Sequence, residues 1–422
     1  MTFYQFDNYS ITLDKKGVNI YTKASYPIRY GQYSEIKTKE FVYHFNQNGE
    51  IRFIQGRGNG WPNPVEWLKR TLGNDWIYYS AGGYAGVFEC MGEYYVPCLP
   101  YGNTSLLDAK PFKNKMIENA IEIWPRVVSS IACLLDGETH IDLSHYISNV
   151  IKNDSARLQQ KAQLFHRLIG GQISVLPPDT RHVDYDVIPV IIADGCLYNC
   201  GFCRVKSGNR FESRSKEDIL NQIRQLKGFL GRDIINYNAV FLGQHDALNA
   251  PAELINFAAQ NAYDIFELKL SNMKGANLFL FGSVKSFLDK EPSFFQDLNR
   301  LPYKTYINIG VESADPATLK YLKKPIELKD IIHTFERMMA INHHFENIEI
   351  TLNFVIGEML PENHVPSILS LIRDRLDRPY PKGSVYLSPL YDYEKKRYLR
   401  DILHRIKIQS KLPVFFYLIQ RL

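Results

Sequence analysis

The chain contains 422 residues, of which 45% are hydrophobic and 23% are charged, and its net charge at pH 7 is +5. This length allows a large buried core and suggests two or three domains. No apolar run approaches the roughly 20 residues that span a bilayer, and the N-terminus lacks the charged and apolar regions of a signal peptide. We therefore expect a soluble, cytoplasmic protein with no membrane partner, and a reducing compartment argues against a disulfide framework for its six cysteines.

The first part of the chain is rich in strand and aromatic signals. Turn signals at 14–17 and 48–49 separate short alternating runs such as 41–45 and 51–54. Residues 1–180 are predicted to form a β-rich α+β domain that recognises the substrate, with its tyrosines and tryptophans forming a core. Further strands are expected at 76–79, 86–90 and 93–98, and helices at 64–71, 114–135 and 155–169.

Residues 181–390 are predicted to form a second domain of alternating strands and helices. Such alternation indicates parallel strands joined by right-handed crossovers. Six units are too few for a closed eight-stranded barrel, so the fold class is α/β with an open, partial (β/α)6 barrel. The expected strands are 187–193, 239–243, 267–271, 304–311, 348–356 and 384–390, and the expected helices are 215–228, 251–263, 277–289, 315–340 and 363–377.

Three cysteines follow the first predicted strand of this domain within eight residues: Cys196, Cys200 and Cys203. Cubane iron–sulfur clusters normally take four cysteine thiolates. Three local thiolates with no later cysteine would leave one iron open to another ligand. A zinc site would need a second ligand pair, which does not follow. A metal-dependent binding or redox module without radical chemistry stays open as an alternative.

The C-x3-C-x2-C spacing, with Phe202 before the last cysteine, resembles the signature of the radical S-adenosylmethionine (radical SAM) superfamily. The group that this chain resembles includes coproporphyrinogen dehydrogenase, methylthiotransferases and cobalamin-domain members. The resemblance implies an oxygen-sensitive [4Fe-4S] cluster on the three cysteines, shielded by Phe202. It also implies an enzyme that cleaves S-adenosyl-L-methionine reductively to a 5′-deoxyadenosyl radical. This radical would abstract hydrogen from an unidentified substrate, and a reductant such as flavodoxin or ferredoxin would supply the electron.

Ligands of parallel β/α folds gather where the strands end. Gly243 and Asp246 stand where the family has its Gly-Gly-Glu motif, which holds the methionine amino group. His245 is a candidate proton or hydrogen-bond partner, weighed against a structural strand-end histidine. Lys274 follows the third predicted strand and is a candidate cation for a carboxylate, weighed against an ordinary loop before a helix. His245 and Lys274 are the predicted catalytic residues.

The later strand ends resemble further family segments. Glu312 and Ser313 match the Gly-x-Glu-Ser segment, whose acid binds the ribose hydroxyls. The resemblance also implies a cofactor-binding role near the adenine for Asn353, Ile356, Gly357 and Ser388.

Two questions stay open at the edges of this domain. Cys90, Cys98 and Cys133 lie upstream, and a two-cluster sulfur- or methylthio-transferring enzyme acting on RNA or a small molecule would use them. Buried structural thiols are the favoured interpretation. The sequence contains no Asp-x-His-x-x-Gly run, which is the usual cobalamin-ligating segment of the family that the chain resembles. Residues 391–422 hold eight Lys or Arg against three acids and are predicted to form a basic helical tail packed on the core, where a solvated face is favoured over a nucleic-acid partner.

Overall fold

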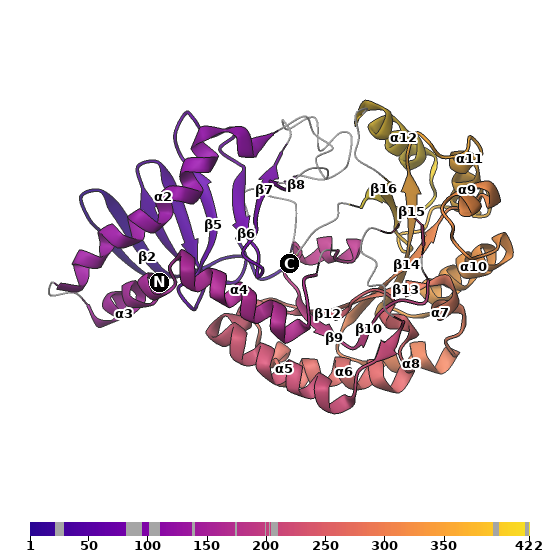
Figure 1. The fold of residues 1–422 in the computed structure, drawn as a ribbon, viewed down its shortest axis with the longest axis horizontal. Helices are drawn as coiled ribbons and strands as arrows, with labels where there is room; N and C mark the ends of the chain where they lie inside the picture. Colours follow the sequence, from indigo (N-terminus) through magenta and orange to yellow (C-terminus); the bar gives the residue numbers. More distant parts are fainter. Residues whose placement is uncertain are drawn as a thin grey trace.

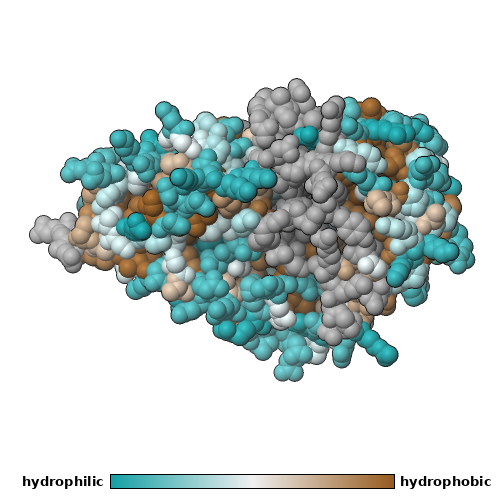
Figure 2. Space-filling model, turned by 45° about the horizontal axis from the view of Figure 1, so that its top comes forward, coloured by the Kyte–Doolittle hydropathy of each residue, from teal (hydrophilic) through white to brown (hydrophobic). Residues whose placement is uncertain are grey.

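The computed structural model contains two large sheets, which lie next to each other in Figure 1, and a short two-stranded one. The N-terminal sheet is antiparallel and the second sheet is parallel. On the face drawn in Figure 2, hydrophilic side chains cover most of the described surface and hydrophobic ones form smaller areas. The structure describes residues 1–21, 29–81, 95–100, 110–136, 140–173, 175–198, 200–201, 203, 210–390, 396–417 and 422.

The antiparallel sheet has eight strands in the described part of the chain, each paired with the strand before it. Two helices, α2 (Lys115–Ile131) and α3 (Ile141–Lys152), pack on one face of it. The turn predicted at Asn48 and Gly49 is confirmed, and Gly49 has a φ of 79°, which favours glycine. The strands are β1 (Thr2–Gln5), β2 (Tyr9–Lys16), β3 (Gln32–Thr38), β4 (Phe41–Phe45), β5 (Ile51–Gly56), β6 (Trp67–Arg70), β7 (Trp76–Ser80) and β8 (Val96–Cys98).

The helix predicted at 64–71 is wrong, because this segment contains strand β6. Its residue Leu68 pairs with Ile54 of β5 and Tyr78 of β7, and all four residues of β6 are buried. Trp67 stacks on Tyr79, with 5.4 Å between the ring centroids. Cross-strand packing of this kind overrides the weak local helix signal of an opening proline.

The parallel sheet agrees with the predicted partial barrel, because five of its six expected strands lie where they were predicted and the third lies later in the chain. In the described residues its seven strands run in the order β17-β16-β15-β14-β13-β12-β9. The seventh strand, β17, comes from the C-terminal tail that was expected to be helical, after helix α12 (Lys396–Gln409). The strands are β9 (Ile188–Ile191), β12 (Ala239–Gly243), β13 (Asn277–Ser283), β14 (Lys304–Glu312), β15 (Ile348–Ile356), β16 (Val385–Pro389) and β17 (Val414–Phe416).

The third strand of the barrel is not where the sequence placed it. The predicted strand 267–271 contains the 3-10 turn Leu268–Leu270, and β13 occupies the start of the predicted helix 277–289. A short apolar run that is buried on both faces has no periodicity that distinguishes strand from helix. Lys274 therefore precedes β13 at the amino edge of the sheet, where its backbone N–H donates to Asn19 O at 2.7 Å.

Helices cover the outer face of the parallel sheet (Figure 1). The predicted helix 315–340 divides into α9 and α10 at residues 322–327. Helix α4 (Ser155–Ile169) packs on α5 and β9, and its Phe165 and Ile169 belong to the core of the parallel sheet. The other helices are α5 (Lys216–Leu230), α6 (Ala252–Ile265), α7 (Val284–Leu288), α8 (Pro292–Arg300), α9 (Pro316–Tyr321), α10 (Leu328–His344) and α11 (His364–Leu369).

The face of the sheet away from these helices is polar and is partly filled by the turn η3 (Pro178–Val183). Asp179 Oδ2 accepts a hydrogen bond from Thr351 Oγ1 at 2.8 Å. Thr351 Oγ1 also accepts from Asn308 Nδ2 at 3.0 Å, and the His182 ring stacks on Tyr306 with centroids 4.8 Å apart. The segment before β9 thus covers part of the inner face of the parallel sheet.

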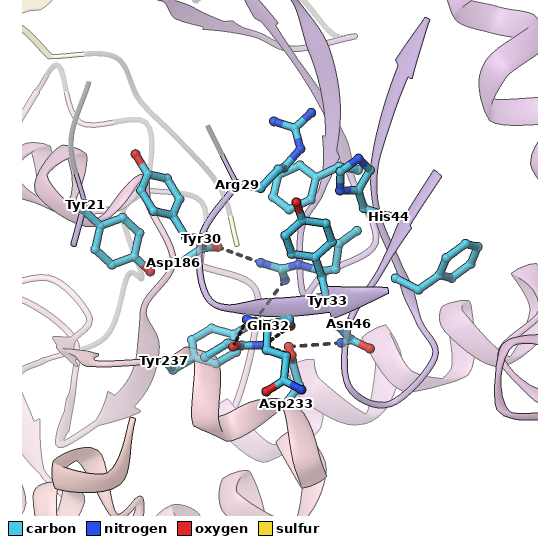
Figure 3. Close-up of a pocket in the computed structure, with 14 residues that line it drawn as sticks. Tyr21, Arg29, Tyr30, Gln32, Tyr33, His44, Asn46, Asp186, Asp233 and Tyr237 are labelled. Carbon is cyan, nitrogen blue, oxygen red and sulfur yellow. Dashed lines mark hydrogen bonds and ion pairs between the residues drawn. The ribbon is translucent and has the colours of Figure 1, made fainter. Parts of the chain in front are cut away.

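A partly buried ion pair and hydrogen bonds join the two sheets at the amino edge of the barrel (Figure 3). Asp186, just before β9, lies 2.8 Å from Arg52 Nη2 and 2.8 Å from Lys69 Nζ. Asn46 Nδ2 donates to Asp233 Oδ2 at 3.1 Å. The cavity between these groups has a volume of about 50 Å³, far below the several hundred Å³ of typical ligand pockets. This edge connects the domains and lies opposite the strand ends that carry the cysteines.

None of the helices in the described ranges is long and apolar enough to cross a membrane.

Removing Asp186 should destabilise the protein because two buried cations would lose their partner. We expect Asp186→Ala to lower the free energy of unfolding by about 3 kcal/mol or more. The matched control is Asp297→Ala, which breaks an exposed pair with Arg300 Nη1 at 3.1 Å and should cost under about 1 kcal/mol. Denaturant unfolding measures both variants, and equal losses would contradict the structural role of the buried pairs.

Asp179 should make stability depend on pH. Burial, with a further contribution from Glu349, raises the pKa of this carboxyl from 3.8 to about 7. The stability that Asp179 contributes is therefore complete below about pH 4 and is lost as the pH rises through 7. Asp179→Asn should remove this loss, which amounts to at most about 4 kcal/mol. Unfolding measured from pH 4 to 8 tests this, and exposed Asp142→Asn should follow the wild type. The same pH profile in Asp179→Asn would show that Asp179 does not titrate in this range.

Candidate active site at the carboxyl ends of the strands

The three cysteines lie on a loop whose base is closed by a short two-stranded ladder. Ala193 and Asp194 pair with Ser213 and Glu212, respectively. The Arg214 guanidinium donates from Nε and Nη2 to the two carboxylate oxygens of Asp194, both at 2.8 Å. A bidentate contact of this kind fixes orientation as well as distance. The ladder and the ion pair therefore hold the start of the loop next to its end, just after β9.

The three cysteines follow the carboxyl end of β9 and differ in how far their side chains are buried. Cys200 is buried, whereas Cys196 and Cys203 are partly exposed. Burial raises the pKa of Cys196 and Cys200, and the positive charge of Lys324 opposes this shift for both thiols. The backbone N–H of Gly201 donates to Leu322 O at 3.1 Å, which ties the loop to the segment after α9.

Asp246 follows β12 and is buried next to the end of β13. Its Oδ1 accepts hydrogen bonds from the backbone N–H of Ser283 at 2.8 Å and from Ser286 Oγ at 2.7 Å. Its Oδ2 is buried and has no hydrogen-bond partner among the described residues. Burial raises the pKa of this carboxyl. A buried carboxylate oxygen without a partner is costly, so it marks a place where a cationic or hydrogen-bonding ligand group would be favoured.

Glu312 ends β14 in a buried pair with Lys324. Lys324 Nζ lies 3.2 Å from Glu312 Oε1, and Asn353 Nδ2 of β15 donates to Glu312 Oε2 at 3.0 Å. Glu312 has a φ of 69°, at a register shift between β14 and β15. A Cβ on Gly310 would come within 2.6 Å of Glu312 Oε1, so only glycine leaves room for the carboxylate. Lys324 was not among the predicted residues.

Lys324 is a buried cation at the centre of this arrangement. Burial alone would lower its pKa, but the charges of Glu312 and Cys200 outweigh this and raise it. Its Nζ also lies 5.7 Å from the centroid of the Tyr198 ring, within the cysteine loop. The sequence signal for its position is Pro325, which disfavours helix in the residue before it. Reading 315–340 as one helix hid this signal.

Residues 190–372 match the family model of the radical SAM superfamily. These residues form a radical SAM domain. Members of the superfamily are enzymes that use a [4Fe-4S] cluster and S-adenosyl-L-methionine, so this chain is an enzyme with these cofactors. No curated protein matches the chain.

Solved structures of low sequence identity also match the chain. A radical SAM methyltransferase from Sphaerobacter thermophilus is 13% identical, with a TM-score of 0.36, and the match covers 55% of this chain and 67% of that one. The cobalamin-dependent radical enzyme OxsB is 16% identical, with a TM-score of 0.31, over 53% of this chain and 31% of OxsB. Elp3 from Methanocaldococcus infernus is 12% identical, with a TM-score of 0.32, over 46% of this chain and 51% of Elp3.

The residues of the radical SAM domain fit the cofactors in their donor chemistry. Three thiols lie on one loop, the unpartnered Oδ2 of Asp246 follows β12, and the buried Lys324 ammonium pairs with Glu312 at the end of β14. Within the described residues no group of three or more His, Cys, Asp or Glu side chains is arranged for a single metal ion. This is compatible with a cluster, because a cluster spreads its cysteine ligands more widely than one ion does.

Ser313 is held by groups of the protein itself. Its Oγ lies 2.8 Å from His364 Nδ1 and accepts from the backbone N–H of Asp315 at 3.0 Å. His364 Nε2 donates to Val355 O at 2.7 Å, so in the neutral imidazole Nδ1 accepts a hydrogen bond from the Ser313 hydroxyl. Burial lowers the pKa of His364, in agreement with the neutral form. His364, which sequence reasoning missed, thereby fastens the end of β14 to the end of β15.

Ile356 does not face the site as expected. Successive side chains of a strand point to opposite faces, and Asn353 shares the inner face with Val355. Ile356 points to the helical side, where it is fully buried in the main core. Val355 instead forms a small apolar cluster with Leu322 and Leu390. Val355, not Ile356, therefore faces the inner side of the sheet.

The other predicted residues divide between the two edges of the barrel. Gly243 ends β12, and His245 follows it with a pKa lowered by burial. Gly357 and Ser388 lie at the carboxyl ends of β15 and β16. Lys274 lies before β13 at the amino edge, whereas the cysteine loop follows the carboxyl end of β9, and its catalytic role stays a prediction. Phe202 lies outside the described residues.

The upstream cysteines differ in their surroundings. Cys98 is buried in the core of the N-terminal sheet, as predicted for a structural thiol. Cys133 is exposed, contrary to the expectation of a buried side chain, and its Sγ donates to Ser130 O at 3.0 Å. Cys90 lies outside the described residues.

Proposed function

We propose that this chain is a catalytic radical SAM enzyme that acts on the C–H bond of a substrate still to be identified. Cys196, Cys200 and Cys203 would hold the [4Fe-4S] cluster. The observation that carries this proposal is the meeting of the cysteine loop with Lys324, the buried partner of Glu312, at the carboxyl edge of the barrel. The cofactors would supply an electron to S-adenosyl-L-methionine and so generate the 5′-deoxyadenosyl radical that abstracts hydrogen.

Asp246, after β12, and Lys324, beside the end of β14, would hold the two charged groups of the methionine moiety. The unpartnered Oδ2 of Asp246 is suited to accept from the amino group. Lys324 carries three N–H donors and contributes one contact to Glu312, so the others can meet the carboxylate. We thus assign to Lys324 the cationic role that the sequence suggested for Lys274.

The nucleoside would lie over the ends of β14 and β15. Each oxygen of Glu312 has a second acceptor site, so the carboxylate can accept from ribose hydroxyls while Lys324 and Asn353 hold it in place. Val355, Leu322 and Leu390 provide an apolar surface for the adenine ring. Ser313 and His364 would act as positioning residues, because their hydrogen bonds fix the two strand ends relative to each other.

The proposal extends to the N-terminal sheet, the electron donor and the location of the protein. We propose that the N-terminal sheet recognises the substrate and that a flavodoxin or ferredoxin provides the electron. A cytoplasmic location would protect the oxygen-sensitive cluster. The two-cluster alternative gains no support from the described residues, because Cys98 is sealed in an apolar core and Cys133 lies at the surface.

Substitution of Cys200 tests the proposed function most simply. After anaerobic reconstitution, wild-type protein should hold about four iron atoms per chain and release 5′-deoxyadenosine when dithionite and S-adenosyl-L-methionine are added. Cys200→Ser should lose both properties, because the cluster would lose a thiolate ligand.

Cys133→Ser is the matched control, since it removes an exposed thiol far along the chain from the loop. It should keep the iron content and the product. Iron-free, well-folded wild-type protein would refute the proposal, and about eight iron atoms per chain that fall on Cys133→Ser substitution would favour the two-cluster enzyme.

A further inference from the structure

One side of the cysteine loop is open to solvent. Leu197 has 37% of its surface exposed, although it is a large apolar residue. Gly201 is exposed as well, between the buried Cys200 and the partly exposed Cys203. Exposed residues of the protein therefore lie next to the cysteines in the chain at this edge of the loop.

The end of helix α9 lies against the same edge. The hydrogen bond from Gly201 N–H to Leu322 O joins the two segments. Lys323 has a φ of 53°, and its Cδ lies 3.1 Å from the position that a Cβ on Gly201 would take. The aliphatic part of Lys323 thus packs on the loop while its ammonium group stays exposed. Tyr321, in the last turn of α9, has 49% of its surface exposed.

We call Leu197, Gly201, Lys320, Tyr321 and Lys323 the loop-edge patch. Its two lysines are exposed, and neither forms an ion pair with any residue that the structure describes. Two other exposed lysines are neutralised: Lys285 pairs with Asp289 at 2.7 Å, and Lys329 pairs with Glu327 at 2.8 Å. The patch thus combines two unneutralised positive charges with exposed apolar and aromatic surface.

We propose that the loop-edge patch docks an acidic one-electron carrier protein, such as a reduced flavodoxin. This inference rests on the proposed function, which requires an electron from outside the chain. In the docked complex one electron leaves the carrier, which is oxidised by one electron, and enters the site through the exposed edge of the cysteine loop. Small apolar areas rimmed by complementary charge are typical of weak electron-transfer complexes.

A nucleic acid fits these observations less well. Nucleic-acid surfaces neutralise several phosphates with a continuous series of cations, whereas the described part of the patch offers two lysines. Exposed Leu197 also finds no partner on a phosphate backbone. Docking next to the cysteines gives the lysines a function that a distant phosphate contact would not require.

Charge reversal tests the patch through binding, without any need for catalysis. Oxidised flavodoxin is titrated into the reconstituted protein, and the dissociation constant is measured at several salt concentrations. The variant Lys320→Glu/Lys323→Glu should bind at least about tenfold more weakly and with a shallower salt dependence. The matched control, Arg232→Glu/Lys269→Glu, makes the same charge change on exposed residues at the amino edge and should bind like the wild type.

A second readout separates docking from chemistry. Production of 5′-deoxyadenosine driven by reduced flavodoxin should fall in the patch variant, whereas production driven by dithionite should stay at the wild-type level. Equal flavodoxin affinity in the patch variant and the wild type would overturn the assignment. It would also be overturned if a short RNA oligomer lost affinity for the patch variant while flavodoxin kept it. A wild type that makes no product even with dithionite would contradict the proposed function, and the binding titration would still decide the patch.

Discussion

The site depends on a constraint of the parallel sheet, which brings the carboxyl ends of all its strands to one edge. Two contacts convert this edge into a single unit. Gly201 of the cysteine loop bonds to Leu322, and two residues later Lys324 pairs with Glu312 at the end of β14. The cysteine loop, the fourth strand end and the fifth strand end are thus connected, since Asn353 holds the other oxygen of Glu312.

The opposite edge of the barrel has a different task. There Asp186 compensates two buried cations of the N-terminal sheet, and the cavity between the sheets is small. Buried pairs of this kind fix geometry more than they add stability, because their desolvation offsets much of the attraction. The amino edge therefore connects the two large sheets, and the carboxyl edge holds the residues of the candidate active site.

Much of this arrangement could be predicted from local sequence. The cysteine spacing, the glycine and acid after β12 and the glutamate ending β14 are short patterns that carry their own chemistry. Lys324 and His364 could not be found this way, because their roles arise from contacts with residues 12 and 51 positions away. The third strand failed for a related reason: its apolar residues are buried on both faces, which leaves no periodicity to read. Because this strand was predicted at 267–271, Lys274 was expected at the carboxyl edge, whereas it lies at the amino edge.

The central claim is that the cofactor is held at the carboxyl edge by Lys324 and its neighbours. The most direct test is the equilibrium affinity of reconstituted protein for S-adenosyl-L-methionine in two lysine variants. Lys324→Gln should bind about tenfold or more weakly, because it loses a charged hydrogen bond, whereas Lys274→Gln should bind like the wild type. Unchanged affinity in Lys324→Gln together with a loss in Lys274→Gln would contradict the account.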